Sequence, residues 1–114
     1  MSGFTFPMCS GPRATGRTHN AIARLTPGDV FVAASAHAAR EAERIARKTH
    51  GDDAGDLVII SLSHDPDSLR GRRGCVVLDH YAEQVLACNY YDPRAARWRH
   101  AIEMCNINAA RRRA

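Results

Sequence analysis

The stretch that decides the predicted fold is Gly11-Pro12-Arg13-Ala14-Thr15-Gly16-Arg17-Thr18. It fits the pattern G-x-x-x-x-G-K-[ST], except that an arginine stands where lysine is usual. Glycines in such a loop let the backbone bend until several N–H groups point at one anion. We therefore interpret residues 11–18 as a phosphate-binding loop (P-loop) that surrounds the phosphates of a nucleotide.

The last two residues of the loop are predicted to carry most of its chemistry. A helix that begins near residue 17 would add its positive N-terminal end. Thr18 would place a hydroxyl on Mg²⁺, and Arg17 would place its charge on the β and γ phosphates. Arginine is larger than lysine, planar and always charged, so it can preserve phosphate binding and still misplace the catalytic charge. The alternative is a surface loop that binds nothing.

A second candidate residue ends an apolar run later in the chain. Residues 75–79 read Cys-Val-Val-Leu-Asp, which is the form of a Walker B strand. An acid at the tip of a parallel strand lies at the edge of the sheet where ligands bind, so Asp79 is predicted to hold Mg²⁺ through water. Hydrolysing proteins of this architecture commonly have glutamate at the next position, where this chain has His80. Histidine can act as a base near neutral pH. For Asp79 the alternative is a turn residue with no ligand.

Short apolar runs alternate with helical stretches in the rest of the chain. Strands are expected at 3–9, 30–34, 57–62 and 75–78, and helices at about 17–25, 36–49, 81–88 and from 92 onwards. The run at 57–62 is apolar on both faces, which is typical of a parallel sheet covered by helices. This order predicts an α/β fold: a three-layer αβα sandwich with a mostly parallel sheet, like that of the P-loop NTPases.

Length and composition indicate a single domain over residues 1–114, with a basic C-terminal tail at about 109–114. The chain has 114 residues, of which 45% are hydrophobic and 25% charged, an ordinary globular balance. Its net charge of +4 favours partners that carry phosphate, such as nucleotides or nucleic acid, without choosing between them. The terminal arginines 111–113 either complement the negative end of the last helix or contact nucleic acid.

The sequence offers little support for other kinds of site. No apolar run approaches the length that spans a bilayer, and the N-terminus has no secretory pattern, so we expect no membrane contact and a cytoplasmic protein. The acidic and histidine residues near positions 50–56 and 64–67 lack the spacing of a known metal site. Trp98 shares a helical spacing with Ile102 and Cys105, which favours core packing over stacking on a base.

Two segments of the chain resemble the ATPase domain of phage terminase large subunits, which pump DNA into viral capsids. That family has approximately P-[DE]-x-L-R-G followed, after a few residues, by hydrophobic residues and D-E-Y-A. This chain reads Pro66-Asp67-Ser68-Leu69-Arg70-Gly71 and then Val76-Val77-Leu78-Asp79-His80-Tyr81-Ala82. The resemblance covers roughly residues 4–82. The chain departs from the family at Arg17 and His80, and contains neither its coupling motif nor its nuclease domain.

The resemblance adds expectations about activity. Terminase P-loops often carry an arginine at the position of Arg13, which is thought to act in cis on the γ-phosphate, so Arg13 joins Asp79 and His80 as a predicted catalytic residue. The resemblance implies binding of ATP and Mg²⁺ and slow hydrolysis in a bacterial or phage-infected cell. The alternative is a degenerate P-loop module that binds nucleotide or nucleic acid without turnover. DNA and a second copy of the chain are candidate partners, because such ATPases often complete their site with a neighbour's arginine.

Overall fold

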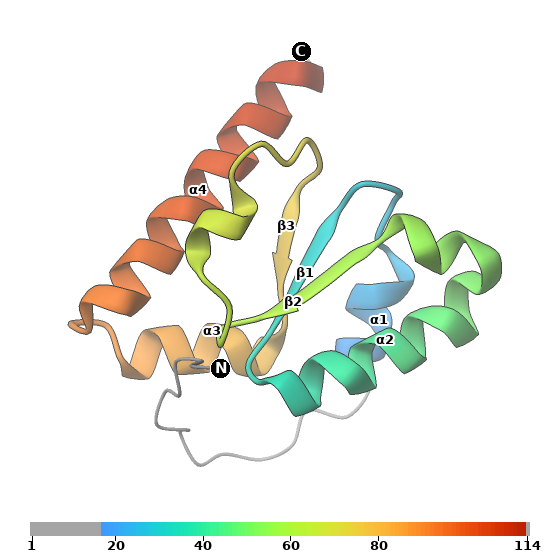
Figure 1. Cartoon of the computed structure of the whole chain (residues 1–114), viewed down its shortest axis with the longest axis horizontal. Helices are drawn as coiled ribbons and strands as arrows, with labels where there is room; N and C mark the ends of the chain where they lie inside the picture. Colours follow the sequence, from blue (N-terminus) through green and yellow to red (C-terminus); the bar gives the residue numbers. More distant parts are fainter. Residues whose placement is uncertain (1–16, 114) are drawn as a thin grey trace.

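Three parallel strands form the centre of the molecule, in the order β2-β1-β3 (Figure 1). The computed structural model describes residues 17–113, with side chains from Thr18 to Arg112. The central strand β1 (Val30–Ala33) pairs with β2 (Val58–Ser61) and with β3 (Val76–Leu78), and Val30 lies in register with Val58 and Val76. The predicted α/β class with a parallel sheet is confirmed. The strand expected at 3–9 lies outside the described residues.

Helices connect the strands close to where the sequence predicts them. The order is α1 (Arg17–Ala23), β1, α2 (Ala36–His50), η1 (Gly51–Asp56), β2, η2 (Pro66–Leu69), β3, α3 (His80–Cys88) and α4 (Pro93–Arg113). The elements η1 and η2 are short 3-10 helices in segments that were expected to be loops. η2 begins at a turn in which the Asp65 carboxylate accepts a hydrogen bond of 2.9 Å from the backbone N–H of Asp67.

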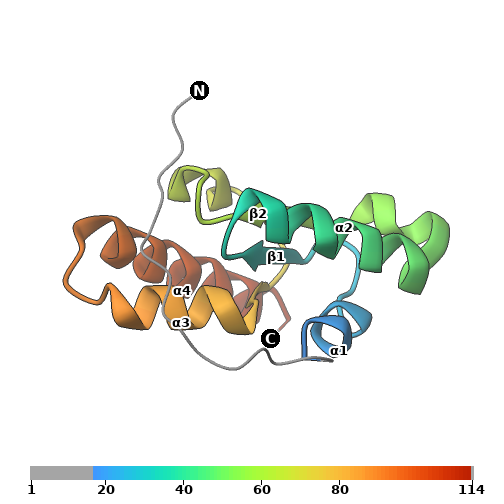
Figure 2. The same cartoon turned by 90° about the horizontal axis from the view of Figure 1, so that it is seen from below.

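Side chains that alternate along β1 enter two separate apolar clusters. Phe31 and Ala33 pack with α1 and α2, whereas Val30 and Val32 pack with η2, α3 and α4. Helices therefore cover both faces of the sheet, as Figures 1 and 2 show. Trp98 is fully buried in the cluster that contains Val30 and Val32, so its predicted role in the core is confirmed. It offers no surface for stacking on a base.

Local sequence signals set the helix ends. The Ser35 hydroxyl accepts a hydrogen bond of 3.2 Å from the backbone N–H of Ala38 at the start of α2, and Gly51 ends that helix with a positive φ of 61°. Before α4, a carboxylate oxygen of Asp92 accepts a bond of 2.8 Å from the backbone N–H of Arg94. The side-chain hydrogen bond from Arg94 is the main cause that lowers the pKa of Asp92.

The basic segment at 109–113 is not a separate tail. It continues α4, and Ala109 is buried. The reason is a helical spacing that runs on past the residues recognised in the sequence, because Ala109 follows Cys105 by one turn on the same buried side. The Arg112 guanidinium also donates to the carbonyl oxygens of Arg72 and Arg73, at 3.3 and 3.4 Å. Within residues 17–113, no helix is both long enough and apolar enough to cross a membrane.

The turns before β1 and β3 come into close backbone contact at Gly74. A β-carbon placed on Gly74 would lie 2.2 Å from the carbonyl oxygen of Gly28 and 2.7 Å from the backbone nitrogen of Asp29. The buried Asp29 carboxylate accepts hydrogen bonds from the backbone N–H of Cys75 at 3.1 Å and from the Thr26 hydroxyl at 2.9 Å. Only glycine at position 74 permits this close approach, which sets the start of β3 beside β1.

We expect Gly74→Ala to destabilise the protein by about 1–3 kcal/mol, because the added methyl group forces backbone atoms apart. The matched control is Gly55→Ala, where a β-carbon meets nothing within 4 Å. Thermal or urea unfolding of the two variants measures the difference. Equal stability of both variants would contradict the close approach at Gly74.

The side chain of Asn106 in α4 bonds to the outer edge of β3. Its Oδ1 accepts a hydrogen bond of 2.6 Å from the backbone N–H of Val76, and its Nδ2 donates to the Val76 carbonyl oxygen at 3.3 Å. These are the two groups that a neighbouring strand would otherwise bind. One amide side chain thus attaches α4 to the sheet.

Replacing Asn106 with alanine should cost about 1–3 kcal/mol, because the N–H of Val76 loses its partner in a partly buried place. The control is Asn108→Ala on the same helix. Urea unfolding should show the loss for Asn106→Ala only, because alanine favours the helix at both positions, and a similar loss for both variants would contradict a specific role of the Asn106 amide.

Candidate functional site

Asp79 follows β3 directly and is buried, with 3% of its surface exposed. Its backbone N–H donates to the Val32 carbonyl oxygen at 2.9 Å, which continues the pairing with β1 by one residue. Asp79 is also the N-cap residue of α3, yet its side chain makes no capping hydrogen bond. The carboxylate is therefore directed to a different use from the common one at this position.

That use is a contact with the first turn of α1. The Thr18 hydroxyl donates to Oδ1 of Asp79 at 2.6 Å, across a sequence separation of 61 residues. α1 is held in place by Ile22, which is fully buried in the same cluster as Phe31 of β1. His50 at the end of α2 adds a second anchor, with its Nε2 atom 2.7 Å from the Ile22 carbonyl oxygen. The pairing of Thr18 with Asp79 therefore rests on a packed helix.

The contact lies at the carboxyl edge of the sheet, where the connections after β1 and β3 diverge. After β1 the chain turns to α2 on one face of the sheet, and after β3 it turns to α3 on the other face. Adjacent parallel strands whose connections leave to opposite faces form a switch point, and ligands of open α/β sheets bind outside the carboxyl ends there. Asp79 stands at that end of β3, next to β1.

The structure places the remaining predicted site residues as follows. Gly11, Pro12, Arg13, Ala14, Thr15 and Gly16 lie outside the described residues, and Arg17 is described only as the first residue of α1. His80 begins α3 beside Asp79, is partly buried, and has its ring edge-on to that of Tyr81 with centroids 5.8 Å apart. Among the described residues, the structure thus brings together the two that the sequence predicted to hold Mg²⁺, with His80 next to them.

The donor set of the pair suits a hard cation. A carboxylate and a hydroxyl offer oxygen ligands, and Mg²⁺ is usually bound by one or two carboxylates together with waters and substrate phosphates. Over residues 17–113, no group of three or more His, Cys, Asp or Glu side chains is arranged to hold a metal without such a substrate. Waters, or the phosphate oxygens of a substrate, would supply the other ligands of an Mg²⁺ ion held at Asp79.

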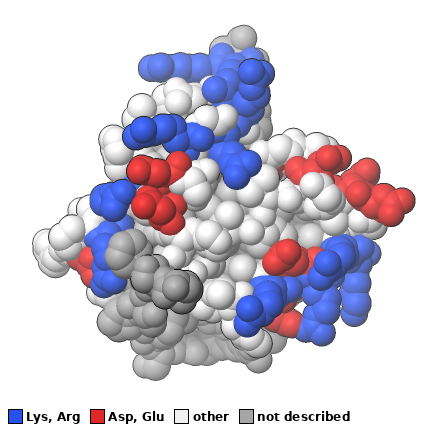
Figure 3. Space-filling view, in the orientation of Figure 1, with Lys and Arg blue, Asp and Glu red and all other residues white. Residues whose placement is uncertain are grey.

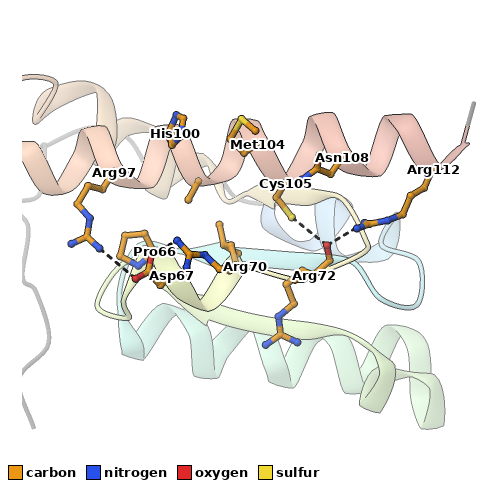
Figure 4. A pocket seen from close by; sticks show the side chains of 13 residues that line it. Pro66, Asp67, Arg70, Arg72, Arg97, His100, Met104, Cys105, Asn108 and Arg112 are labelled. Carbon is orange, nitrogen blue, oxygen red and sulfur yellow. Dashed lines mark hydrogen bonds and ion pairs between the residues drawn. The ribbon is translucent and has the colours of Figure 1, made fainter.

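A second feature was missed in the sequence: a groove between η2 and α4, with a volume of about 390 Å³ (Figure 4). Arginines dominate its charged lining: Arg70, Arg72, Arg97 and Arg112, with Asp67 as the acid. The available signal was the spacing along α4, because residues 97, 101, 105, 108 and 112 lie on one side of a helix. This spacing alone does not predict the groove, because its other wall, η2, comes from a different part of the chain.

Comparisons of the chain with known protein families, with curated proteins and with solved structures found no match.

Proposed function

We propose that the chain is a P-loop NTPase-like αβα domain that binds ATP with Mg²⁺ at the carboxyl edge of the sheet, between β1 and β3. Residues 11–18 would surround the phosphates, with Thr18 and Asp79 at the metal. The observation that carries the proposal is the hydrogen bond of 2.6 Å between the Thr18 hydroxyl and the buried Asp79 carboxylate. DNA coupling and self-association, as in terminases, are not needed for it.

Two properties of this contact argue for a ligand site over a plain turn. A buried carboxylate is costly unless it is well bonded, and the nearby capping position would satisfy it locally. Asp79 instead bonds to Thr18, which is 61 positions away. Each of the two residues belongs to a different motif, and each motif predicts Mg²⁺ binding. The alternative of a surface loop that binds nothing does not account for the hydrogen bond between Thr18 and this carboxylate.

The chemistry of the site follows from the residue types. Bound Mg²⁺ would neutralise charge that develops on the phosphates. Asp79 accepts the hydrogen bond of the Thr18 hydroxyl and would supply a negative charge near a bound metal, and Arg13 and Arg17 would supply positive charge to the phosphates. His80 is the residue next to Asp79 that can accept a proton from water. Because a histidine stands in the usual place of glutamate, we expect slow turnover.

Binding is tested by the effect of ATP with Mg²⁺ on thermal unfolding. A ligand present at about a hundred times its Kd stabilises the folded state by about 2.7 kcal/mol, which raises Tm by several degrees. We expect this rise in the parent protein, and its loss in Asp79→Asn, in Thr18→Val, and in the parent when Mg²⁺ is replaced by EDTA.

The matched controls are Asp53→Asn and Thr49→Val, which change the same residue types at exposed positions. Both should retain the full rise in Tm. The proposal fails if the parent shows no rise, or if Asp79→Asn rises as much as the parent does.

His80 favours a second candidate function, a module that holds nucleotide without hydrolysis. The two are separated by phosphate release at saturating ATP. A slow ATPase releases phosphate above a buffer blank and loses that release in Asp79→Asn, and His80→Glu should accelerate it by about tenfold or more, since a placed general base contributes about 10²–10⁴. A parent protein that binds ATP and releases no phosphate would establish the binding module.

A further inference from the structure

The groove between η2 and α4 has an excess of positive charge that the protein itself compensates only weakly. Four arginines and one aspartate line it. Arg97 reaches Asp65 at 3.4 Å and Asp67 at 3.9 Å, and Arg70 reaches Asp67 at 4.0 Å. These side chains are more than half exposed, and such surface pairs contribute little to stability. They can be exchanged for contacts with an anionic ligand at low cost.

The floor of the groove is apolar. Leu69 and Cys105 are buried, and burial raises the pKa of the Cys105 thiol. On α4 itself, His100 and Met104 lie one turn apart on the rim of the groove, and both are exposed. Figure 4 shows them on the edge of α4 that faces away from Arg70 and Arg72. An imidazole ring stacks on nucleobases, and a methionine sulfur makes favourable contacts with aromatic rings. The α4 rim of the groove therefore suits a flat aromatic group.

The charged ends of the groove are far apart. Arg97 and Arg112 are separated by 15 residues of α4, or about 22 Å at 1.5 Å per residue. At the rise of 3.4 Å per nucleotide found in a duplex strand, that length spans about six nucleotides, and fewer in a more extended strand. Figure 3 shows Lys and Arg atoms gathered over the C-terminal part of α4 and the loop before β3. A single nucleotide is too short to reach both ends.

We infer that this groove binds a short run of single-stranded nucleic acid. Arg97 and Arg112 contact phosphates at its two ends, Arg70 contacts a phosphate between them, and bases lie on His100 and Met104. The inference does not depend on the nucleotide site at Asp79, because no residue that lines the groove belongs to that site.

An acidic peptide is the competing partner for a set of arginines. It would use the charged ends of the groove, whereas the exposed thioether of Met104 between them favours an aromatic ring over a carboxylate. The combination of charge and stacking groups is typical of proteins that bind single strands without sequence preference.

The test is fluorescence anisotropy with a labelled single-stranded oligonucleotide of about eight nucleotides, titrated over a range of salt concentrations. The double variant Arg97→Ala/Arg112→Ala should bind at least about tenfold more weakly than the parent. Its plot of log K against log salt should be less steep by about 1.4, because two phosphate contacts are lost. Met104→Ala should weaken binding without changing that slope.

The matched control is Arg40→Ala/Arg47→Ala, which removes the same charge from exposed positions on α2. It should leave affinity nearly unchanged. Melting curves check that each variant is folded, and Arg97→Ala alone serves if the double variant is unstable, because Arg97 contacts only exposed carboxylates.

Three results would overturn the inference. The first is an equal loss of affinity in the control and groove variants, which would indicate nonspecific attraction to the whole protein. The second is binding of a glutamate-rich peptide of similar length as tightly as the oligonucleotide. The third is equally tight binding of a mononucleotide, which would make the groove a small-molecule site.

Discussion

A single contact between a hydroxyl and a carboxylate organises the candidate site. Asp79 is removed from solvent at the end of β3, and Thr18 supplies the donor that its charge requires. The contact also joins α1, which packs on one face of the sheet, to the start of α3, which packs on the other face. The geometry at the carboxyl edge therefore depends on both apolar clusters, although neither Thr18 nor Asp79 belongs to them.

The two candidate features are joined by one stretch of chain. Residues from Pro66 to Arg72 line one wall of the groove. The chain then passes the close approach of Gly74 to Gly28, enters β3, and arrives at Asp79 three residues after the strand begins. β3 is short, pairs with β1, and is held on its outer side by Asn106. The groove wall and the candidate metal ligand thus stand at opposite ends of the same short strand.

Much of the fold was predictable because its signals are local. Ser35, Gly51 and Asp92 mark helix ends through their own backbone contacts, and the apolar runs identify β1, β2 and β3 without knowledge of their neighbours. The strand order β2-β1-β3 and the groove were not predictable, since both depend on pairing between distant segments. The pairing of Thr18 with Asp79 lies between these cases: the motifs named the two residues, and their roles in binding stay a prediction.

The amide of Asn106 also has a consequence for the behaviour of the protein in concentrated solution. A sheet margin with unsatisfied backbone groups is a template on which another polypeptide can add itself, and natural proteins protect such margins with side chains, helices or loops. Here one side chain satisfies both backbone groups of Val76 and brings α4 against the strand. The same residue that attaches the last helix thus makes that margin a poor seed for intermolecular β-assembly.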